Sequence, residues 1–268
     1  MRKKTVLIVV AHADDMEFMA GGIVARFAQE CGYAVYEYIL TDNRRGSYRL
    51  DVDELVATSA REAVAAGRIL GLEEVRLEGY PDGMLNEEAP NVLRDKVMAM
   101  IRAVRADIVM SWDPFAPYED HPDHRMAAMA TLDAAAFAGN PKFHPEHAHA
   151  PYPPTEAYWF AKSPVDAACV VDIATTIDTK IAALLAHDCQ LLFTADMLKL
   201  EAQTLGITVP VLEHPEKNYR QLIEAGVRQW CAETGEPAGY AYGERFRYQK
   251  ISALDTMLGM DTVQPDFH

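Results

Sequence analysis

The stretch that decides the fold is VLIVVAHADDME, residues Val6–Glu17. Its first five residues are apolar and mostly β-branched, which is typical of a strand buried on both faces and so of a parallel sheet. The strand runs directly into His12, Asp14 and Asp15, whose side chains can bind a metal ion or transfer a proton. The stretch therefore predicts a central strand with a polar site at its carboxyl end.

Strands and helices alternate downstream to about residue 138. Glycines close two of the expected helices, and each helix carries an apolar stripe at helical spacing. The expected strands are Thr5–Val10, Tyr33–Leu40, Glu74–Leu77 and Asp107–Trp112, and the expected helices are Ile23–Glu30, Asp51–Leu70, Asn91–Val104 and Asp123–Phe137. This order predicts an α/β fold with a doubly wound, mostly parallel sheet flanked by helices.

The rest of the chain is expected to pack on the same domain. The expected elements are strands at Ala157–Phe160 and Ala168–Val171, and helices at Thr175–Leu192, Ala195–Leu205 and Lys217–Cys231. Gly239–Tyr248, rich in glycine and aromatic residues, is expected to cover the site. We predict a single domain over residues 1–268, with a core at about 1–192 and an elaboration at about 193–268.

Composition limits the partners. The net charge of −15, from 40 acidic and 25 basic residues, argues against nucleic acid or an anionic membrane as the main partner. No segment approaches the ~18 apolar residues of a membrane span. The basic start Met1–Thr5 leads into a short apolar run that fits a cytosolic first strand better than a signal peptide. Scattered cysteines without a Cys-x-x-Cys pair indicate reduced thiols, so we expect a cytoplasmic protein. Apolar C-terminal helices allow a homo-oligomer.

Polar residues follow each expected strand, at the edge where open α/β sheets bind ligands. Residues 12–15 follow the first strand, Asp42–Ser47 the second, Asp82 the third and Asp113 the fourth. Within HPDH, His121 and His124 are three residues apart and share a face if a helix begins there. These positions predict a shared site built from both motifs.

The residue types suggest roles in that site. His12, Asp15 and His124 form a two-histidine, one-carboxylate set that leaves room for a water. Asp14 lies beside the set as a general base, and His121 is placed to contact a substrate oxygen. Taken alone, each motif has a simpler explanation, a helix cap for His-x-x-Asp and an ordinary loop for HPDH; together they favour chemistry.

For other polar residues, the sequence favours or allows a position in solvent or in a loop over a catalytic role. Glu119 and Asp120 are expected to be solvated acids. The histidines of the proline-rich segment Gly139–Pro154 have no carboxylate beside them in sequence, so we favour an exposed loop over a second metal site at His144, His147 and His149. Arg44, Arg45 and Arg49 either grip a hydroxyl-rich or anionic substrate or belong to a solvated loop.

These motifs resemble those of the PIG-L/LmbE-like zinc-dependent N-deacetylases. Ala11–Glu17 is similar to the family's Ala-His-Pro-Asp-Asp-x-Glu motif, and His121–His124 matches its second motif. Asp113–Asp120 is most similar to the diacetylchitobiose and N-acetylglucosamine deacetylases of the family. Further similarities, spread over nearly the whole chain, are Arg61-Glu62, Leu70-Gly71, Asp82-Gly83, Val171–Ile173, Lys180, His187–Gln190 and Tyr242–Arg247.

The resemblance implies a Rossmann-like fold and hydrolysis of an N-acetyl group from a glucosamine-type sugar. It implies that His12, Asp15 and His124 bind one Zn²⁺ per chain, with Asp14 as general base and His121 stabilising the oxyanion. Asp123 is expected beside them, raising the basicity of an imidazole or of another neighbouring group. The expected substrate contacts are Arg49, Asp82, Tyr118 and His187.

The sequence departs from the family pattern at three places. Ala13 replaces the usual proline, Cys189 stands where serine is usual, and the loop Asn43–Gly46 is not the usual glycine-containing version. The first loosens the turn that holds Asp14 and Asp15 but removes no chemical group. The unusual loop sequence leaves undecided which residues of that loop contact the substrate.

The favoured hypothesis is a metal-dependent N-deacetylase acting on a small amino-sugar, with neither nucleic acid nor membrane as partner. The first alternative is an amidase of the same family acting on a thiol conjugate or another acyl amide. The second is a non-catalytic sugar-binding domain with a structural metal. A dinucleotide site is disfavoured because Gly21-Gly22 lie too far beyond the first strand.

Overall fold

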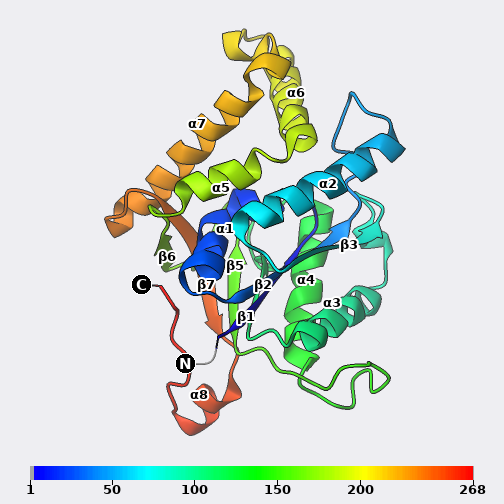
Figure 1. Ribbon diagram of the computed structural model, residues 1–268, viewed down its shortest axis with the longest axis vertical. Helices are drawn as coiled ribbons and strands as arrows, with labels where there is room; N and C mark the ends of the chain where they lie inside the picture. Colours follow the sequence, from blue (N-terminus) through cyan, green and yellow to red (C-terminus); the bar gives the residue numbers. More distant parts are fainter. Residues whose placement is uncertain (1–2, 268) are drawn as a thin grey trace.

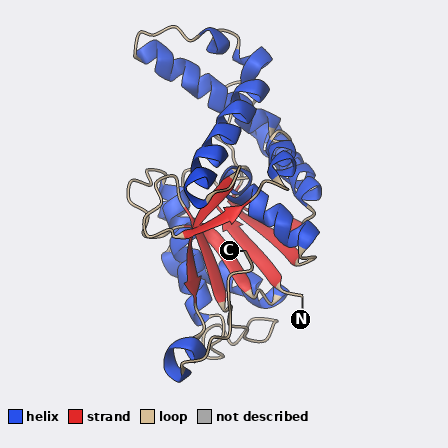
Figure 2. Cartoon of the chain, turned by 90° about the vertical axis from the view of Figure 1, so that its left-hand side faces the viewer, coloured by secondary structure: helices blue, strands red, loops and turns tan. Residues whose placement is uncertain are grey.

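The computed structural model describes residues 3–267, so the predictions that include Met1, Arg2 and His268 lie partly outside the described residues. A central sheet is covered by helices on both faces (Figures 1 and 2). Its strands are β1 (Thr5–Val10), β2 (Ala34–Thr41), β3 (Glu74–Tyr80), β4 (Ile108–Trp112), β5 (Glu156–Phe160), β6 (Cys169–Asp172) and β7 (Gly243–Lys250).

The helices are α1 (Asp15–Ala25), α2 (Val52–Leu70), α3 (Pro90–Val104), α4 (Pro122–Phe137), α5 (Ile177–Leu184), α6 (Asp188–Thr204), α7 (Pro215–Gly235) and α8 (Ala253–Leu258). A π-helical turn, Arg26–Glu30, extends α1. Short 3₁₀ turns occur at Leu85–Glu87, Pro210–Leu212 and Glu236–Ala238.

The strand order is β3-β2-β1-β4-β5-β7-β6. Strands β1 to β5 pair in parallel, whereas β7 runs antiparallel between β5 and β6. The predicted α/β class with a mostly parallel sheet is therefore confirmed. The chain leaves β1 toward β2 on one side and returns to β4 on the other, so the carboxyl ends of β1 and β4 form the switch point where such sheets bind ligands.

Strand β1 forms the centre of the core, because each residue from Val6 to Val10 is fully buried. One face of the strand packs with residues of α1, α2 and α5, and the opposite face packs with residues of α3 and α4. This double burial explains the uninterrupted apolar run in the sequence, since neither face meets water.

Two predictions about the C-terminal half are wrong. The helix expected at Thr175–Leu192 is two helices, α5 and α6, that meet at 85°. The break lies at His187, whose buried ring approaches Glu17 of α1 at 3.3 Å. The helix expected at Ala195–Leu205 is the remainder of α6, which begins at Asp188.

The stretch expected to cover the site is instead strand β7, which completes the sheet between β5 and β6. Helices α6 and α7 project beyond the sheet (Figure 1). Within residues 3–267 no single helix has the length and hydropathy to cross a bilayer; α5 and α6 meet those criteria only as a bent pair.

A buried ion pair locks β7 to α1. The Lys180 ammonium donates to the Glu244 carboxylate at 2.6 Å and to the carbonyl of Phe18 at 2.7 Å. The same carboxylate accepts from the backbone amides of Gly22 and Ile23, both at 2.8 Å. Gly22 is required here, since a Cβ would lie 2.7 Å from Ile173. The ion pair thus fixes the helix that begins at Asp15.

Lys180→Met is expected to lower the free energy of unfolding by about 3–5 kcal/mol, because Glu244 would remain buried without its cation. Urea denaturation followed by circular dichroism measures the change. Lys199→Met is the matched control, since Lys199 binds only the exposed carbonyl of Glu213 and its loss should cost under about 0.5 kcal/mol. A loss for Lys180→Met below about 1 kcal/mol would contradict a structural role for the pair.

Candidate metal centre and active site

Three side chains converge at the switch point between β1 and β4. The Nδ1 atom of His12 lies 3.1 Å from Nε2 of His124 and 3.6 Å from Oδ1 of Asp15. His124 Nε2 lies 3.2 Å from the same Asp15 oxygen. Ligands at about 2.0–2.1 Å from a tetrahedral ion are about 3.3–3.4 Å apart, so the spacing fits one divalent metal.

The outer nitrogens of both imidazoles face carboxylates. His12 Nε2 lies 3.2 Å from Asp82 and 3.6 Å from Asp123, and His124 Nδ1 lies 3.0 Å from Glu119. Donation of these outer N–H groups leaves the inner nitrogens with lone pairs that point at each other, which favours a cation between them. Carboxylates in this position orient metal-binding histidines and raise their basicity.

The electrostatics of the site also favour a cation. Burial lowers the pKa of His12, but Asp15, Asp123 and Asp82 together raise that pKa well above its usual value. Burial raises the pKa of Asp15, but His124 and His12 hold it well below its usual value. The carboxylates therefore stay ionised and create a negative field that a proton or a metal ion can neutralise.

Asp15 also fixes the turn that carries the site. Its Oδ2 atom accepts from the backbone amides of Ala11 at 3.1 Å and His12 at 2.9 Å, and from the Trp112 indole at 2.9 Å. The Trp112 ring stacks on His124 with centroids 3.9 Å apart. Strand β4 and helix α4 are thereby held against the turn after β1.

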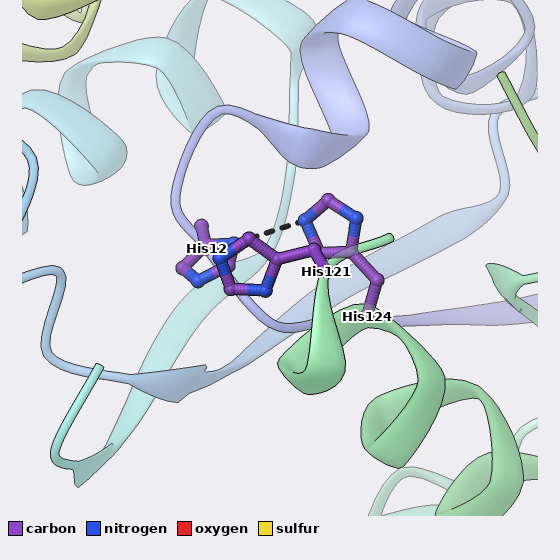
Figure 3. Close-up of side chains that lie close together, drawn as sticks. All are labelled: His12, His121 and His124. Atoms are coloured by element: carbon purple, nitrogen blue, oxygen red, sulfur yellow. Dashed lines mark hydrogen bonds between the residues drawn. The ribbon is translucent and has the colours of Figure 1, made fainter. Parts of the chain in front are cut away.

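His121 lies at the start of α4, and its ring packs against the rings of His12 and His124 (Figure 3). The backbone amide of Asp123 donates to His121 Nδ1 at 3.2 Å, which assigns the ring proton to Nε2. Burial and the neighbouring His12 and His124 lower the pKa of His121, which favours the neutral ring. His121 therefore offers an N–H donor beside the three converging side chains.

Asp14 lies at the start of α1 and lines a cavity that His12, Asp15 and His124 also line. Burial raises its pKa, and the neighbouring Asp15 carboxylate raises it further. A carboxylate with a raised pKa next to a metal-binding set suits proton transfer near neutral pH.

Asp123 lies behind the cavity and has a structural position. Its carboxylate accepts from the amides of Gly83 at 2.6 Å and Leu85 at 3.0 Å, and it is fully buried. It therefore ties the turn after β3 to the HPDH motif and approaches His12 from the outer side. These contacts do not place it against a substrate.

A polar cavity of about 430 Å³ opens over the converging side chains. Six of the predicted residues line it: His12, Asp14, Asp15, Asp82, His121 and His124. The sequence reasoning did not assign a site role to Gln190, Phe193 and Thr194 of α6, and left Asn43, Arg45 and Gly46 undecided. The α6 residues were missed because the bend at His187 that brings them over the site has no local signal.

Three predicted substrate contacts lie elsewhere. Arg49 forms a two-pronged ion pair with Asp196 at 2.8 and 2.7 Å, in a separate surface groove. Tyr118 is 89% exposed and does not line the cavity. His187 is fully buried beneath the site, facing Glu17. None of these three residues lines the cavity over the converging side chains, and their contact with a substrate stays a prediction.

Glu119 was predicted to be a solvated acid, and this is wrong. It is buried beside His124 and also accepts from the Lys162 ammonium at 3.1 Å. Its neighbour Asp120 accepts from the same ammonium at 3.0 Å but has an 85% exposed side chain, as expected. The position of Glu119 five residues before His124 gave no clue, because the pairing depends on the loop conformation.

The proline-rich loop is also better ordered than its sequence indicates. Asp95 of α3 lies 3.0 Å from His144 and 2.6 Å from His147, so a carboxylate does pair with these rings. Arg102 donates to His147 Nδ1 at 3.0 Å, to three loop carbonyls and to the carbonyl of Ala138 at the end of α4. This donation leaves the His147 proton on Nε2 facing Asp95, which favours the predicted exposed loop over a second metal site.

Two departures from the family pattern contact each other. The amide of Ala13 donates to Asn43 Oδ1 at 3.2 Å, and Asn43 Nδ2 donates to Ser59 at 2.9 Å. Asn43 adopts a left-handed backbone with φ of 55°, which asparagine tolerates better than most residues. A proline at position 13 would have no amide to donate.

Comparisons with known proteins agree with this geometry. Residues 7–135 match the family described as PIG-L, GlcNAc-PI de-N-acetylase. The diacetylchitobiose deacetylase of Thermococcus kodakarensis is 29% identical over 203 residues, which cover 74% of this chain and 73% of that protein. The 1D-myo-inositol 2-acetamido-2-deoxy-alpha-D-glucopyranoside deacetylase of Rhodococcus opacus is 30% identical over 185 residues, 59% of this chain and 62% of that protein.

The solved N,N'-diacetylchitobiose deacetylase from Pyrococcus horikoshii, complexed with an inhibitor, shares the fold. It superposes with a TM-score of 0.75 at 24% identity, covering 95% of this chain and 88% of that one.

Glu119→Ala is expected to weaken binding of a divalent metal by about 10–100-fold, because His124 loses the carboxylate that orients it. Competition with a chromophoric chelator measures the affinity. Asp120→Ala is the matched control, since it also removes a contact to Lys162 but none to a histidine of the site. Equal affinities for the two variants would show that Glu119 does not support a metal site.

Proposed function

We propose that this chain is a zinc-dependent hydrolase that removes the N-acetyl group from an N-acetylglucosamine-type sugar. The match of residues 7–135 to the PIG-L family and the similarity to diacetylchitobiose deacetylase support this proposal. The observation that carries the proposal is the convergence of His12, Asp15 and His124 beside Asp14 and His121. These residues would hold one Zn²⁺ with open positions, whereas Asp14 and His121 stay free for proton transfer and hydrogen bonding.

A bound divalent metal supplies Lewis acidity, which polarises a carbonyl and lowers the pKa of a bound water to about 7. In the proposed reaction Asp14 accepts a proton from the attacking water. The His121 Nε2–H donates to the oxygen on which negative charge develops. Asp14 then passes its proton to the departing nitrogen, so that one water and one amide give acetate and a free amino-sugar.

The remaining groups orient these side chains. We propose that Asp123 is a positioning residue, because it accepts two backbone amides and approaches His12 from behind. Asp82, which lines the cavity, would contact both His12 and a sugar hydroxyl. Arg45 and Asn43 extend the polar wall on the same side.

The cavity also bears on the rival hypothesis of a sugar-binding domain with a structural metal. Structural zinc sites are closed by a fourth protein ligand. Here a polar cavity of about 430 Å³ opens directly on the converging side chains, which favours a reacting ligand over a closed site.

Asp14→Asn is expected to lower kcat by about 10²–10⁴-fold because the amide cannot accept the water proton. Free amine released from N-acetylglucosamine and its short oligomers measures turnover by the zinc-loaded protein. Metal content, measured in parallel, should stay near one ion per chain, which separates loss of the base from loss of the metal. Turnover within about tenfold of the parent would overturn the assignment of Asp14 as the base.

A further inference from the structure

A second cavity, of about 390 Å³, adjoins the first. The two cavities share Asp14, Asp15 and His124 and have no other lining residue in common. The reacting centre of the proposed function therefore lies at their junction. A substrate bound there has room to extend into both cavities.

The second cavity is apolar where the first is polar. Beyond the three shared residues it is lined by Phe18, Met19, Trp112, Lys162 and Trp230. The ammonium of Lys162 is engaged by Glu119 at 3.1 Å and Asp120 at 3.0 Å, so its charge is already paired. The wall of the second cavity, formed by these residues, thus offers aromatic and aliphatic surface and few groups that could hydrogen-bond a sugar hydroxyl.

This wall is preformed. Trp112 is only 3% exposed, and its indole is fixed by the hydrogen bond to Asp15 and by stacking on His124. Met19 and Trp230 also line a further cavity of about 250 Å³ and so separate it from the apolar one. These two side chains set how far a ligand can reach from the junction.

The two sides of an amide match the two cavities. The carbonyl carbon carries the amine part on one side and the acyl part on the other. With that carbon at the junction, a hydroxyl-rich amine belongs in the polar cavity and the acyl group in the apolar one. Apolar surface buried in this way gains about 0.8 kcal/mol per CH₂ group.

An acetyl group is small for this space. An apolar cavity of about 150 Å³ is enough to hold a benzene molecule. The cavity of about 390 Å³ is more than twice that size, so a single methyl group would leave most of the Trp112 and Trp230 surface without contact.

We propose that the amide hydrolysis is not restricted to the N-acetyl group of the proposed function, and that kcat/KM is higher for N-acyl groups of about four to eight carbons, or an aromatic ring of that size, than for acetyl. The inference rests on the proposed amide hydrolysis and names the acyl side of its substrate. Phe18, Met19 and Trp230 are the specificity-determining residues, and Asp14 and His121 act as before.

The test uses the full-length, zinc-loaded protein and four substrates: N-acetyl-, N-butanoyl-, N-hexanoyl- and N-octanoylglucosamine. Free amine release gives kcat/KM for each. We expect kcat/KM to rise by about fourfold per added methylene up to hexanoyl, the ratio that corresponds to about 0.8 kcal/mol per buried CH₂.

Two variants test the wall itself. Met19→Phe narrows the cavity and should lower the ratio of hexanoyl to acetyl turnover by about tenfold. Trp230→Ala opens it toward the adjoining cavity and should shift the best substrate to octanoyl. Gln229→Ala, at the exposed neighbour of Trp230, is the control and should leave the chain-length profile unchanged.

The outcomes separate the two proposals. A profile that is flat, or highest for acetyl, would overturn the acyl preference while amide hydrolysis stands. A parent profile that rises with chain length but does not respond to Met19→Phe or Trp230→Ala would overturn the assignment of this cavity. If the zinc-loaded protein cleaves none of the four substrates, the result would count against the proposed function itself.

Discussion

The structure depends on how the Asp15 carboxylate divides its two oxygen atoms. Oδ2 accepts three N–H donors, two from the turn after β1 and one from Trp112 at the end of β4. Oδ1 faces His12 and His124 and is free to bind a cation. One side chain thus joins the two strands at the switch point and presents an oxygen atom to the two imidazoles, where the proposed metal ion would bind, so fold and site cannot be separated at this residue.

This arrangement concentrates buried acids, which has an energetic cost. Glu17 and Glu37 are fully buried on the side of α1 and β2 that faces the core. Burial and the Glu17 carboxylate raise the pKa of Glu37 well above its usual value, which favours the neutral acid. Closer to the cavity, the neighbouring imidazoles offset the effect of burial and hold the pKa values of Asp15 and Asp82 below their usual values. A metal ion bound there would neutralise the field and stabilise the folded chain, as any ligand of the native state does.

The local sequence predicted the strands and helices whose own pattern of apolar residues shows which face is buried. Strand β1 has the predicted bounds, and α2 and α3 differ by one residue at their starts, since apolar periodicity reports burial directly. The break between α5 and α6 was not predictable, because apolar spacing continues through it and the cause is the distant contact of His187 with Glu17.

The same distinction applies to the site residues. Residues of the two motifs converge because the first motif follows β1 and the second begins α4. The alternation of strands and helices in the sequence had already predicted both positions. Glu119 was misjudged because its contact with His124 depends on loop conformation. The ion pair of Arg49 with Asp196 likewise joins residues far apart in the sequence and has no local signal. The apolar cavity is built from α1, β4 and α7 and has no contiguous sequence signal.

The contact of Ala13 with Asn43 shows how the chain tolerates its departures from the family pattern. Losing a proline in the turn before Asp14 gives the unfolded backbone more freedom, which lowers stability. The amide that replaces it donates to Asn43, whose own amide is held by Ser59 of α2. Since Asn43 also lines the polar cavity, the hydrogen bond fixes the turn and one wall of the cavity together. The unusual loop after β2 and the unusual alanine are therefore one structural feature, which couples the placement of Asp14 to the wall of the polar cavity, where we propose that the amine side of the substrate binds.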